Sequence, residues 1–328
     1  TASYVSQNMG LIGLSCETAE SVNDKGIMRD IWNNAGLAVP EYKIVSSLDE
    51  LKEAINKIGF PCILKPTDCG GAGRGISIIR SYEDVVWSFN FARPYVKNDR
   101  FIIEEFLDGT EMTIESISIG GKVYILAMSD KVKPDVKTRV ATSLNFPAVL
   151  PEVILQKVKK LVQKAVTTIG IDNGMAHTEV IVTKDRPKLV EIGGRGGGGH
   201  VFHTCIETTS GIKAPVECAK LLTGMEVNLS EVKKKGCVYR FFTPPKGILK
   251  SVKNVEKAKS VKGVLDLDIV KKIGEKVGDL ENSLHRTGFV VTKGEDRSEA
   301  ISLADYIESM IQFEVIAINE ENTRDYKK

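Results

Sequence analysis

Two glutamates, Glu179 and Glu191, stand at positions where a short β-hairpin would place them face to face. The β-branched runs Thr178–Val182 and Lys188–Ile192 predict strands. The polar stretch Thr183–Pro187 between them contains a proline and predicts the turn. We therefore expect an antiparallel hairpin that carries one glutamate on each strand.

If Val182 pairs with Lys188 across this turn, Glu179 lies directly opposite Glu191. Opposed side chains have Cβ atoms roughly 4.5–5.5 Å apart, and like charges at that spacing repel. Carboxylates on neighbouring strands suit Mg²⁺, which takes one or two of them and completes its shell with water and phosphate. Arg195 continues the face of Glu191 if the strand extends that far. An ordinary solvent-facing hairpin is the alternative.

A lysine and a glycine-rich turn form a second candidate for chemistry. The apolar run Phe60–Pro66 predicts a buried strand that ends near Lys65, and a buried lysine needs an anionic partner. The turn Thr67–Gly75 leads into another predicted strand, Ile76–Ile79, so it is a hairpin tip and not a P-loop or a dinucleotide-binding turn. Its backbone N–H groups could approach phosphate oxygens, although most such turns are merely tight.

Composition limits the classes of function. A chain of 328 residues, with 42% hydrophobic and 27% charged residues, can form two or three globular domains. A net charge of +2 gives no reason to expect nucleic acid or an anionic membrane as a partner. The six cysteines follow no metal-ligand spacing and fit a reducing compartment, and no apolar run is long enough to cross a bilayer, so we expect a cytoplasmic protein.

The remaining pattern predicts several helices and short strands. Apolar periodicity and stop signals predict the helices Glu17–Gly36, Leu48–Ile58, Tyr82–Ala92, Val153–Thr168, Thr208–Leu222 and Ser298–Met310. Further strands are expected at Tyr42–Val45, Phe101–Leu107, Thr110–Ile119, Lys122–Ser129 and Phe289–Thr292, and Gly236–Phe242 begins a segment of short strands and loops. The polar stretch Lys131–Val149 is a candidate substrate loop or a plain solvent loop.

Several ordered motifs together resemble the ATP-grasp superfamily, over roughly residues 11 to 316. The motifs are Asn23-Asp-Lys25 before Ala35-Gly36 and Pro40, Ile63-Leu-Lys65-Pro66, Gly70-Gly-Ala-Gly-Arg-Gly75, Ile103-Glu-Glu-Phe-Leu107, Gly109-Thr-Glu111, Gly174-Met-Ala-His177-Thr-Glu179 and Glu191-Ile-Gly-Gly-Arg195. Within the superfamily, Arg195–Gly199, Thr209–Ile212 and Leu284–Gly288 are similar to the carboxylate–amine ligases that include L-amino-acid ligases. Biotin carboxylase and carbamoyl-phosphate synthetase are more distant look-alikes.

The resemblance implies an ATP-grasp fold in which two α+β subdomains clamp ATP. Residues 21–228 would form this domain, with a lid subdomain at about 40–100. A C-terminal α+β domain would follow at 229–318 and a polar tail at 319–328. Residues 1–20 would be the remnant of a Rossmann-like N-terminal domain that is truncated, supplied separately or lost.

The resemblance also implies roles for single residues. Lys25 and Lys65 would contact phosphates, and the loop Gly70–Gly75 would close over the triphosphate. Glu104 would accept a hydrogen bond from the adenine amino group, and Glu111 would bind the ribose hydroxyls. The whole implied ATP-binding set is Lys25, Lys65, Gly70, Gly71, Gly73, Arg74, Gly75, Glu104, Glu105, Phe106, Leu107 and Glu111.

The implied catalytic residues are Arg195, which would steady the transferring phosphoryl group, and Lys65. Glu179 and Glu191 would hold Mg²⁺, with Mn²⁺ as an alternative ion. Many family members carry an asparagine two residues after the second metal carboxylate, where this chain has Gly193. The number of metal ions is therefore left open.

Four further residues are candidates for the substrate: Lys131, His177, His200 and Arg286. His177 is equally readable as a satisfied core histidine, and Arg286 as part of a structural ion pair. The spacing of the histidines matches no common zinc pattern.

The implied reaction is ATP-dependent formation of an amide from a carboxylate and an amine, with amino-acid-type substrates. A carboxylate is a poor electrophile, so ATP would first convert it to an acyl-phosphate. Two alternatives remain at this point: a biotin- or bicarbonate-dependent carboxylase of the same fold, and a catalytically silent nucleotide-binding module. The expected partners are small molecules, and a homodimer is allowed for.

Overall fold

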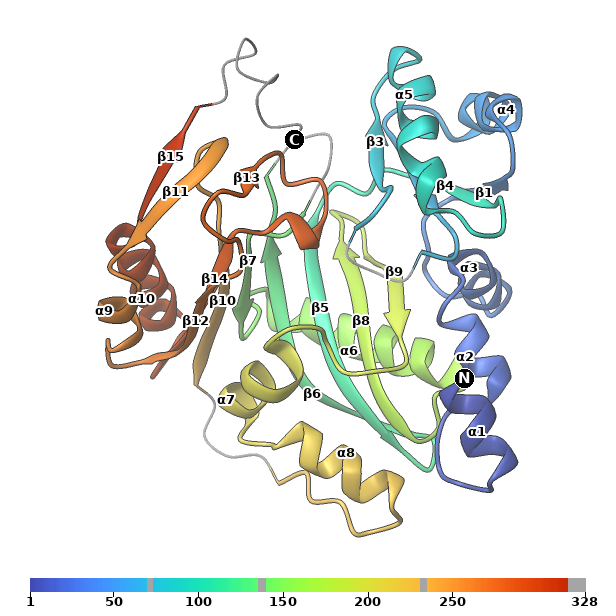
Figure 1. Ribbon diagram of the computed structural model, residues 1–328. Helices are drawn as coiled ribbons and strands as arrows, with labels where there is room; N and C mark the ends of the chain where they lie inside the picture. The colour runs from blue at the N-terminus through green and yellow to red at the C-terminus, as the bar shows by residue number, and fades with distance from the viewer. Residues whose placement is uncertain (70–72, 135–139, 231–234, 318–328) are drawn as a thin grey trace.

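The computed structural model describes residues 1–69, 73–134, 140–230 and 235–317, so the predicted tail 319–328 lies outside them. Three antiparallel sheets organise these residues (Figure 1). Helices and strands mix throughout, as predicted for an α+β protein. The search for a long apolar helix among the described residues finds none that could cross a membrane.

The smaller of the two main sheets, here named the lid, has four strands in the order β1-β4-β2-β3. Its strands are β1 (Tyr42–Val45), β4 (Phe101–Glu105), β2 (Cys62–Pro66) and β3 (Ser77–Ile79). Strand side chains alternate between faces, so Leu64 and Ile103 pack on the helices α4 (Leu48–Ile58) and α5 (Glu83–Ala92). Lys65 and Glu104 therefore face the opposite side, away from those helices.

The large sheet has eight strands in the order β12-β14-β10-β7-β6-β5-β8-β9. Their bounds are β5 (Thr110–Ile119), β6 (Lys122–Val132), β7 (Ser143–Phe146), β8 (Gly174–Val182), β9 (Pro187–Gly193), β10 (Gly236–Phe242), β12 (Val264–Ile269) and β14 (Gly288–Gly294). One face is covered by α6 (Glu152–Thr168) and α10 (Arg297–Met310). Part of the other face packs on α7 (Ile206–Ser210) and α8 (Ala214–Leu222).

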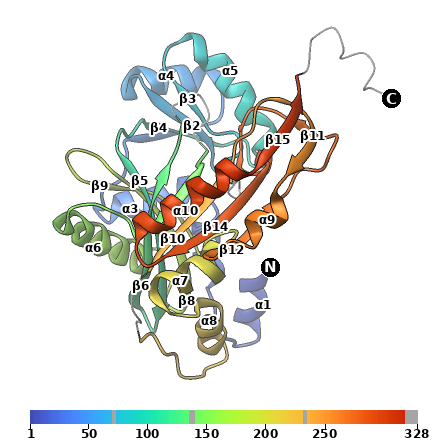
Figure 2. The same ribbon diagram turned by 90° about the vertical axis from the view of Figure 1, so that its left-hand side faces the viewer.

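The lid sits over the rest of that second face (Figure 1 and Figure 2). A three-stranded sheet, β13-β11-β15, flanks the far side of the molecule. It consists of β11 (Gly247–Lys253), β13 (Lys276–Val277) and β15 (Gln312–Ile316), with α9 (Val255–Lys259) beside it. Short helical turns lie at Arg93–Tyr95, Val201–Cys205 and Ser283–His285.

The large sheet runs across the domain boundary proposed at residue 229. Strand β10 pairs with β7, so strands from both sides of the boundary share one hydrogen-bonded sheet. The residues on either side of the boundary can therefore contribute to a single surface.

Three predicted elements were wrong in their extent. Glu17–Gly36 is two helices, α2 (Cys16–Ser21) and α3 (Lys25–Asn34), because the side chain of Asp24 caps a new helix start. Thr208–Leu222 is also two helices, α7 and α8, separated by Gly211, whose φ of 77° ends α7. Lys131–Val149 is not simply a loop.

Within Lys131–Val149 lie the last residues of β6 and all of β7. Lys131 is thus fixed on a strand rather than carried by a loop. At the N-terminus, α1 (Ala2–Asn8) has no buried residue. Within the proposed remnant, residues 1–20, it is Leu14 that packs against the core.

Candidate active site

The hairpin β8–β9 places Glu179 directly opposite Glu191, as predicted. The pairing at the turn is different from the expected one, because Val182 pairs with Pro187 and not with Lys188. A register shift between Glu179 and Val180 makes up the difference of one residue. The expected pair was right, although the pairing assumed at the turn was wrong by one position.

Glu179 lies near two cations from the end of β6, the strand on the far side of β5. The ammonium of Lys131 is 2.5 Å from one Glu179 oxygen and 3.0 Å from a Glu111 oxygen. Lys133 adds a second cation, 2.6 Å from the other Glu111 oxygen. Burial disfavours the charged carboxylates, but the lysines outweigh it and hold the pKa of Glu179 well below its usual range and that of Glu111 below it.

Glu191 has its own cation, from the first residue of α3. The buried ammonium of Lys25 lies 3.2 Å from a Glu191 oxygen and donates to the carbonyl of Cys69 at 3.3 Å. Burial lowers the pKa of Lys25, and Glu191 more than offsets it, so the net shift is upward. Each of the two opposed carboxylates therefore lies next to an ammonium group.

Lys65 and Glu104 face this hairpin from the lid. The Lys65 ammonium donates to one Glu104 oxygen at 2.5 Å, and Arg29 donates to the other at 2.5 Å. Burial opposes ionisation of Glu104, but the two cations hold its pKa at about 2. Its predicted contact with the adenine amino group stays a prediction, and both of its oxygens already accept from cations.

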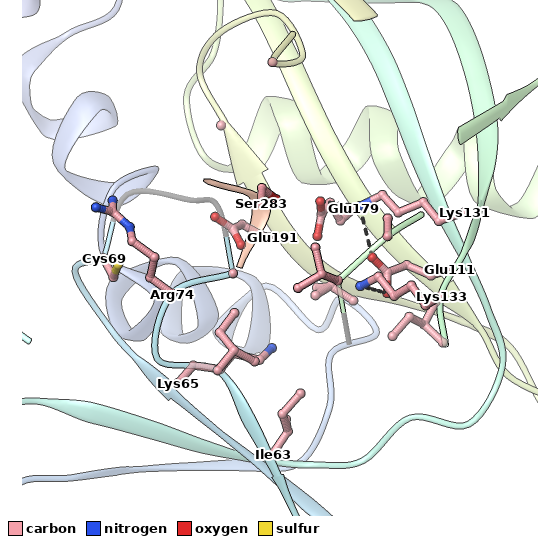
Figure 3. Close-up of a pocket in the computed structure, with 18 of the residues that line it drawn as sticks. Ile63, Lys65, Cys69, Arg74, Glu111, Lys131, Lys133, Glu179, Glu191 and Ser283 are labelled. Atoms are coloured by element: carbon pink, nitrogen blue, oxygen red, sulfur yellow. Dashed lines mark hydrogen bonds and ion pairs between the residues drawn. The ribbon is translucent and has the colours of Figure 1, made fainter. Parts of the chain in front are cut away.

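A pocket of about 540 Å³ lies between the lid and the large sheet. In Figure 3 the carboxylates of Glu179 and Glu191 lie on one side of it, with Lys65 opposite and Lys131 and Lys133 beside Glu111. The predicted site residues that line it are Lys25, Lys65, Gly73, Arg74, Glu104, Glu105, Phe106, Leu107, Glu111, Lys131, His177, Glu179, Glu191, Arg195 and Arg286. Tertiary structure thus brings together residues more than 250 positions apart in the sequence.

The segment after β4 forms one wall of the pocket. Glu105 pairs with Lys188, which anchors the strand end to the hairpin. The N–H of Phe106 donates to the carbonyl of Pro61, and Leu107 is buried. This backbone is therefore fixed in place on the pocket wall.

The glycine-rich loop is described only in part, since Gly70 and Gly71 lie outside the described residues. Gly73 and Arg74 line the pocket. Gly75 does not: a Cβ there would meet Pro66 and Tyr95, 2.9 Å away in each case. Gly75 is thus closely packed inside the lid, and its phosphate contact stays a prediction.

Arg195 lines the pocket from the segment after β9 and not, as expected, from the strand itself. Strand β9 ends at Gly193, so it does not extend to Arg195. The exposed Arg195 guanidinium instead donates to the carbonyl of Gly196 at 2.8 Å. Gly193 also lines the pocket and supplies no side-chain ligand.

His177 is held by a residue that sequence analysis missed. Its Nδ1 lies 2.5 Å from the fully buried carboxylate of Glu115, whose other oxygen accepts from the N–H of Gly197 at 3.0 Å. Burial lowers the pKa of His177, but Glu115 outweighs it and raises the pKa to about 9. A carboxylate inside the apolar strand β5, four residues after Glu111, was the signal that could have identified Glu115.

His200 lies outside the pocket lining, contrary to expectation. Its Nε2 is 3.2 Å from Asp266, and its ring packs on Tyr239 and Phe289. The ring therefore supports the pocket wall from behind. The lining side chain at this point is Tyr239.

Arg286 lines the C-terminal part of the pocket. Its guanidinium carbon lies 3.3 Å from the centre of the Phe241 ring, and it donates to the carbonyl of Ala141 at 2.8 Å. Burial lowers the pKa of Arg286 to about 10. Its buried Nε has no hydrogen-bond partner among the described residues, so the predicted structural ion pair is not what holds it.

The donor set fits Mg²⁺. The described part of the chain holds no cluster of three or more His, Cys, Asp or Glu side chains suited to a metal. Two opposed carboxylates, Glu179 and Glu191, are what the protein offers, and Mg²⁺ commonly takes one or two carboxylates with phosphate and water as its other ligands.

Comparison with known proteins gives two family matches. The model of the ATP-grasp domain matches residues 30–209, and that of the L-amino acid ligase C-terminal domain 2 matches residues 240–315. The chain is 32% identical over 219 residues to an alanine–anticapsin ligase of Bacillus subtilis (strain 168), covering 60% of this chain and 46% of that protein. It is 23% identical over 289 residues to an L-arginine-specific L-amino acid ligase of Bacillus subtilis, covering 86% and 70%.

The chain thus spans about half the length of the curated relatives that it matches first. Among solved structures, an L-amino acid ligase from Bacillus licheniformis has a TM-score of 0.81 at 23% identity, covering 97% of this chain and 77% of that one. A biotin carboxylase from Campylobacter jejuni has a TM-score of 0.71 at 19% identity, covering 96% and 72%. These likenesses show the fold, and because the ATP-grasp domain match covers more than half of the chain, the protein belongs to the ATP-grasp family.

Proposed function

We propose that the protein is an ATP- and Mg²⁺-dependent ligase that joins a carboxylic acid to an amine, with amino-acid-type substrates. The observation that carries this proposal is the opposed pair Glu179 and Glu191, which faces Lys65 across one pocket. The same pocket continues to the partly buried guanidinium of Arg286. A phosphate-handling region and an anion-binding group therefore share one cavity.

The nucleotide would lie between the lid and the large sheet. The backbone after β4, at Phe106 and Leu107, would receive the adenine edge, and Glu111 the ribose hydroxyls. Lys25 and Lys65 would neutralise phosphate oxygens, which phosphoryl transfer needs more than a protein nucleophile. Bound by Glu179 and Glu191, Mg²⁺ would neutralise further charge on the phosphates and orient them.

The reaction has two balanced steps. A substrate carboxylate oxygen attacks the γ-phosphorus of ATP, and ADP leaves with the electrons of the broken P–O bond. The amine nitrogen then attacks the acyl carbon, phosphate leaves, and the nitrogen loses a proton. Arg195, Lys65 and Lys131 line the same pocket. Their cations would stabilise the negative charge that moves between the carboxylate, the phosphoryl group and ADP.

The substrate acid or amine would occupy the C-terminal part of the pocket. The unpartnered Nε of Arg286 suits a carboxylate, because a guanidinium binds this planar anion through two parallel hydrogen bonds. The aromatic wall of Tyr239 and Phe241 would exclude water beside it. An acyl-phosphate hydrolyses readily, so this exclusion protects the intermediate.

The ligase relatives, together with the domain match of the C-terminal segment, favour a ligase over the two alternatives. Both first-named relatives are called amino-acid ligases or alanine ligases, and residues 240–315 match a ligase domain. A carboxylase would instead turn over ATP with bicarbonate and without an amine. A silent module would bind ATP and release no ADP with any acid–amine mixture.

The test is ADP release by the purified chain against a matrix of amino acids, singly and in pairs, with Mg²⁺ present. We expect release that requires a carboxylate, and a condensation product of matching mass when an amine is supplied. Release that needs bicarbonate alone would contradict the proposal. So would ATP binding without ADP release across the whole matrix.

A further inference from the structure

Strand β9 contains one extra residue, Val190, and this residue decides where Glu191 points. On the turn side, Val180 pairs with Leu189; on the other side, Glu179 pairs with Glu191, so Val190 has no partner on β8. A regular ladder would pair Val190 with Glu179 and Glu191 with Thr178. Since successive side chains alternate between faces, Glu191 would then share the face of buried Thr178, away from the pocket.

Arg29 binds the backbone at this bulge. It is a fully buried side chain of α3, with 1% of its surface exposed. Its Nη1 donates to the carbonyl of Leu189 at 2.9 Å, and its Nη2 donates to the carbonyl of Val190 at 2.9 Å. The Leu189 N–H donates in turn to the carbonyl of Ala38, just beyond the same helix. The carbonyls of the bulge are thus held by Arg29 of α3, and the Leu189 N–H is held by Ala38, which follows that helix.

The same guanidinium reaches into the lid. Its Nε and Nη2 donate to one oxygen of Glu104, at 3.2 and 2.5 Å. The other oxygen of Glu104 accepts from the ammonium of Lys65 at 2.5 Å. One arginine therefore links the strand that carries Glu191 to the lysine that faces it across the pocket.

Helix α3 presents two cations to the hairpin, one turn apart. Lys25 contacts the Glu191 carboxylate itself, while Arg29 contacts the backbone just before it. Residues four apart lie on the same helix face, so both side chains reach β9 together. This helix fixes both the side chain and the strand register of Glu191.

Stability alone is a poor explanation for the buried array. Replacing a buried ion pair by apolar residues of similar volume is often neutral or stabilising, because taking charges out of water is costly. The array Arg29–Glu104–Lys65 instead connects the strand that carries Glu191 to the Lys65 ammonium, two groups that would act on the same nucleotide. In this way the array sets the distance between Glu191 and Lys65.

We propose that Arg29 is a positioning residue that couples the two sides of the nucleotide site. Through the bulge it keeps Glu191 on the pocket face, and through Glu104 it holds the Lys65 ammonium toward the phosphates. This inference rests on the proposed function, because it concerns the binding of a metal-bound nucleotide. Arg29 itself contacts neither ligand.

The experiment measures the affinity of the chain for ATP by calorimetric titration, with Mg²⁺ and with EDTA. We call the ratio of the affinity with Mg²⁺ to the affinity with EDTA the metal gain. In Arg29→Lys one ammonium cannot serve both carbonyls and Glu104, so we expect this gain to fall about tenfold or more. Glu104→Gln keeps both carbonyl contacts, so it should weaken ATP binding in EDTA and leave the gain within about threefold of the original.

Arg297→Lys is the matched control. Arg297 also binds one carboxylate, Asp130, and two backbone carbonyls, those of Asn145 and Pro147, and it does not line the pocket. We expect its metal gain to equal that of the unaltered chain. Thermal unfolding of each variant establishes that it is folded, and Glu104→Gln tests the lid branch even if Arg29→Lys does not fold.

A double-mutant cycle separates positioning from a general loss of stability. If Arg29 acts through Glu191, Arg29→Lys should lower the metal gain about tenfold in the original chain and less than twofold in a Glu191→Gln background. Equal effects in both backgrounds, or an unchanged gain in Arg29→Lys, would overturn the inference and leave the proposed function standing. Absence of any metal gain in the unaltered chain would overturn both.

Discussion

The two halves of the pocket are built from different chemistry. The nucleotide half pairs carboxylates with cations: Glu104 with Lys65, Glu179 with Lys131 and Glu191 with Lys25. The C-terminal half is an aromatic wall of Tyr239 and Phe241 with the partly buried cation Arg286. The first half is electrostatically balanced within the protein, whereas the second contains a cation whose Nε has no partner among the described residues.

This difference separates general from specific tasks. A balanced array keeps its carboxylates ionised, and it can exchange ammonium contacts for a metal–phosphate complex with little change in net charge. A lone guanidinium in an aromatic wall selects for one anion at one position. We therefore expect changes in the first half to remove activity with every substrate, and changes in the second to alter substrate preference.

The largest expected effect is that of Glu191→Ala on turnover. Removing one of two opposed carboxylates leaves the metal–phosphate complex without half of its protein ligands, so ADP release should fall at least about 10³-fold with every substrate pair. Steady-state ADP release measures it. The exposed Glu256→Ala is the control, and turnover within a fewfold of normal in Glu191→Ala would remove the metal assignment from the nucleotide half.

The next effect is on stability and its pH dependence, through Glu104→Gln. Breaking a buried pair by removing one partner costs about 3–5 kcal/mol, so we expect a loss of that order in the free energy of unfolding at pH 7. The folded pKa of about 2 lies below the ordinary value of 4.5, so the contribution is present above pH 4.5 and is lost as pH falls toward 2.

Urea unfolding of both chains at pH 7, 4 and 3 measures this difference. It should shrink steadily as the pH falls. Glu308→Gln, which alters a half-exposed carboxylate beside Arg240, serves as the control with a small and nearly constant difference. A large difference that stays constant down to pH 3 would show that the Glu104 charge is not what stabilises the lid contact.

The smallest expected effect belongs to Arg286→Lys in the aromatic half. Lysine keeps the charge but loses the bidentate geometry, so KM for the acid substrate should rise about tenfold while KM for ATP stays within about twofold. Substrate-saturation kinetics distinguish the two constants. Arg240→Lys, on β10 between Tyr239 and Phe241, is the control. A parallel rise in both KM values would mean that the C-terminal half does not determine substrate preference separately from ATP binding.

Sequence reasoning predicted the local parts of this comparison well. Hairpin, lid strands and most helices follow from β-branched runs, apolar periodicity and capping residues, which act over a few neighbours. The spacing of Glu179 and Glu191 about a turn correctly predicted an opposed pair. Sequence reasoning failed where the partner is distant, as with Arg29, whose carboxylate and carbonyls come from positions 104, 189 and 190.

The sequence by itself determined which groups are charged, that the hairpin and the lid strands form, and that two carboxylates need a cation. Only the tertiary structure decided how the carboxylates reach the same face, because the bulge at Val190 corrects a register that the turn alone sets one residue off. It likewise placed His200 behind the pocket wall and Lys131 on a strand. Side-chain type is a local property, whereas register, burial and the choice of counter-ion depend on which distant strands and helices pack together.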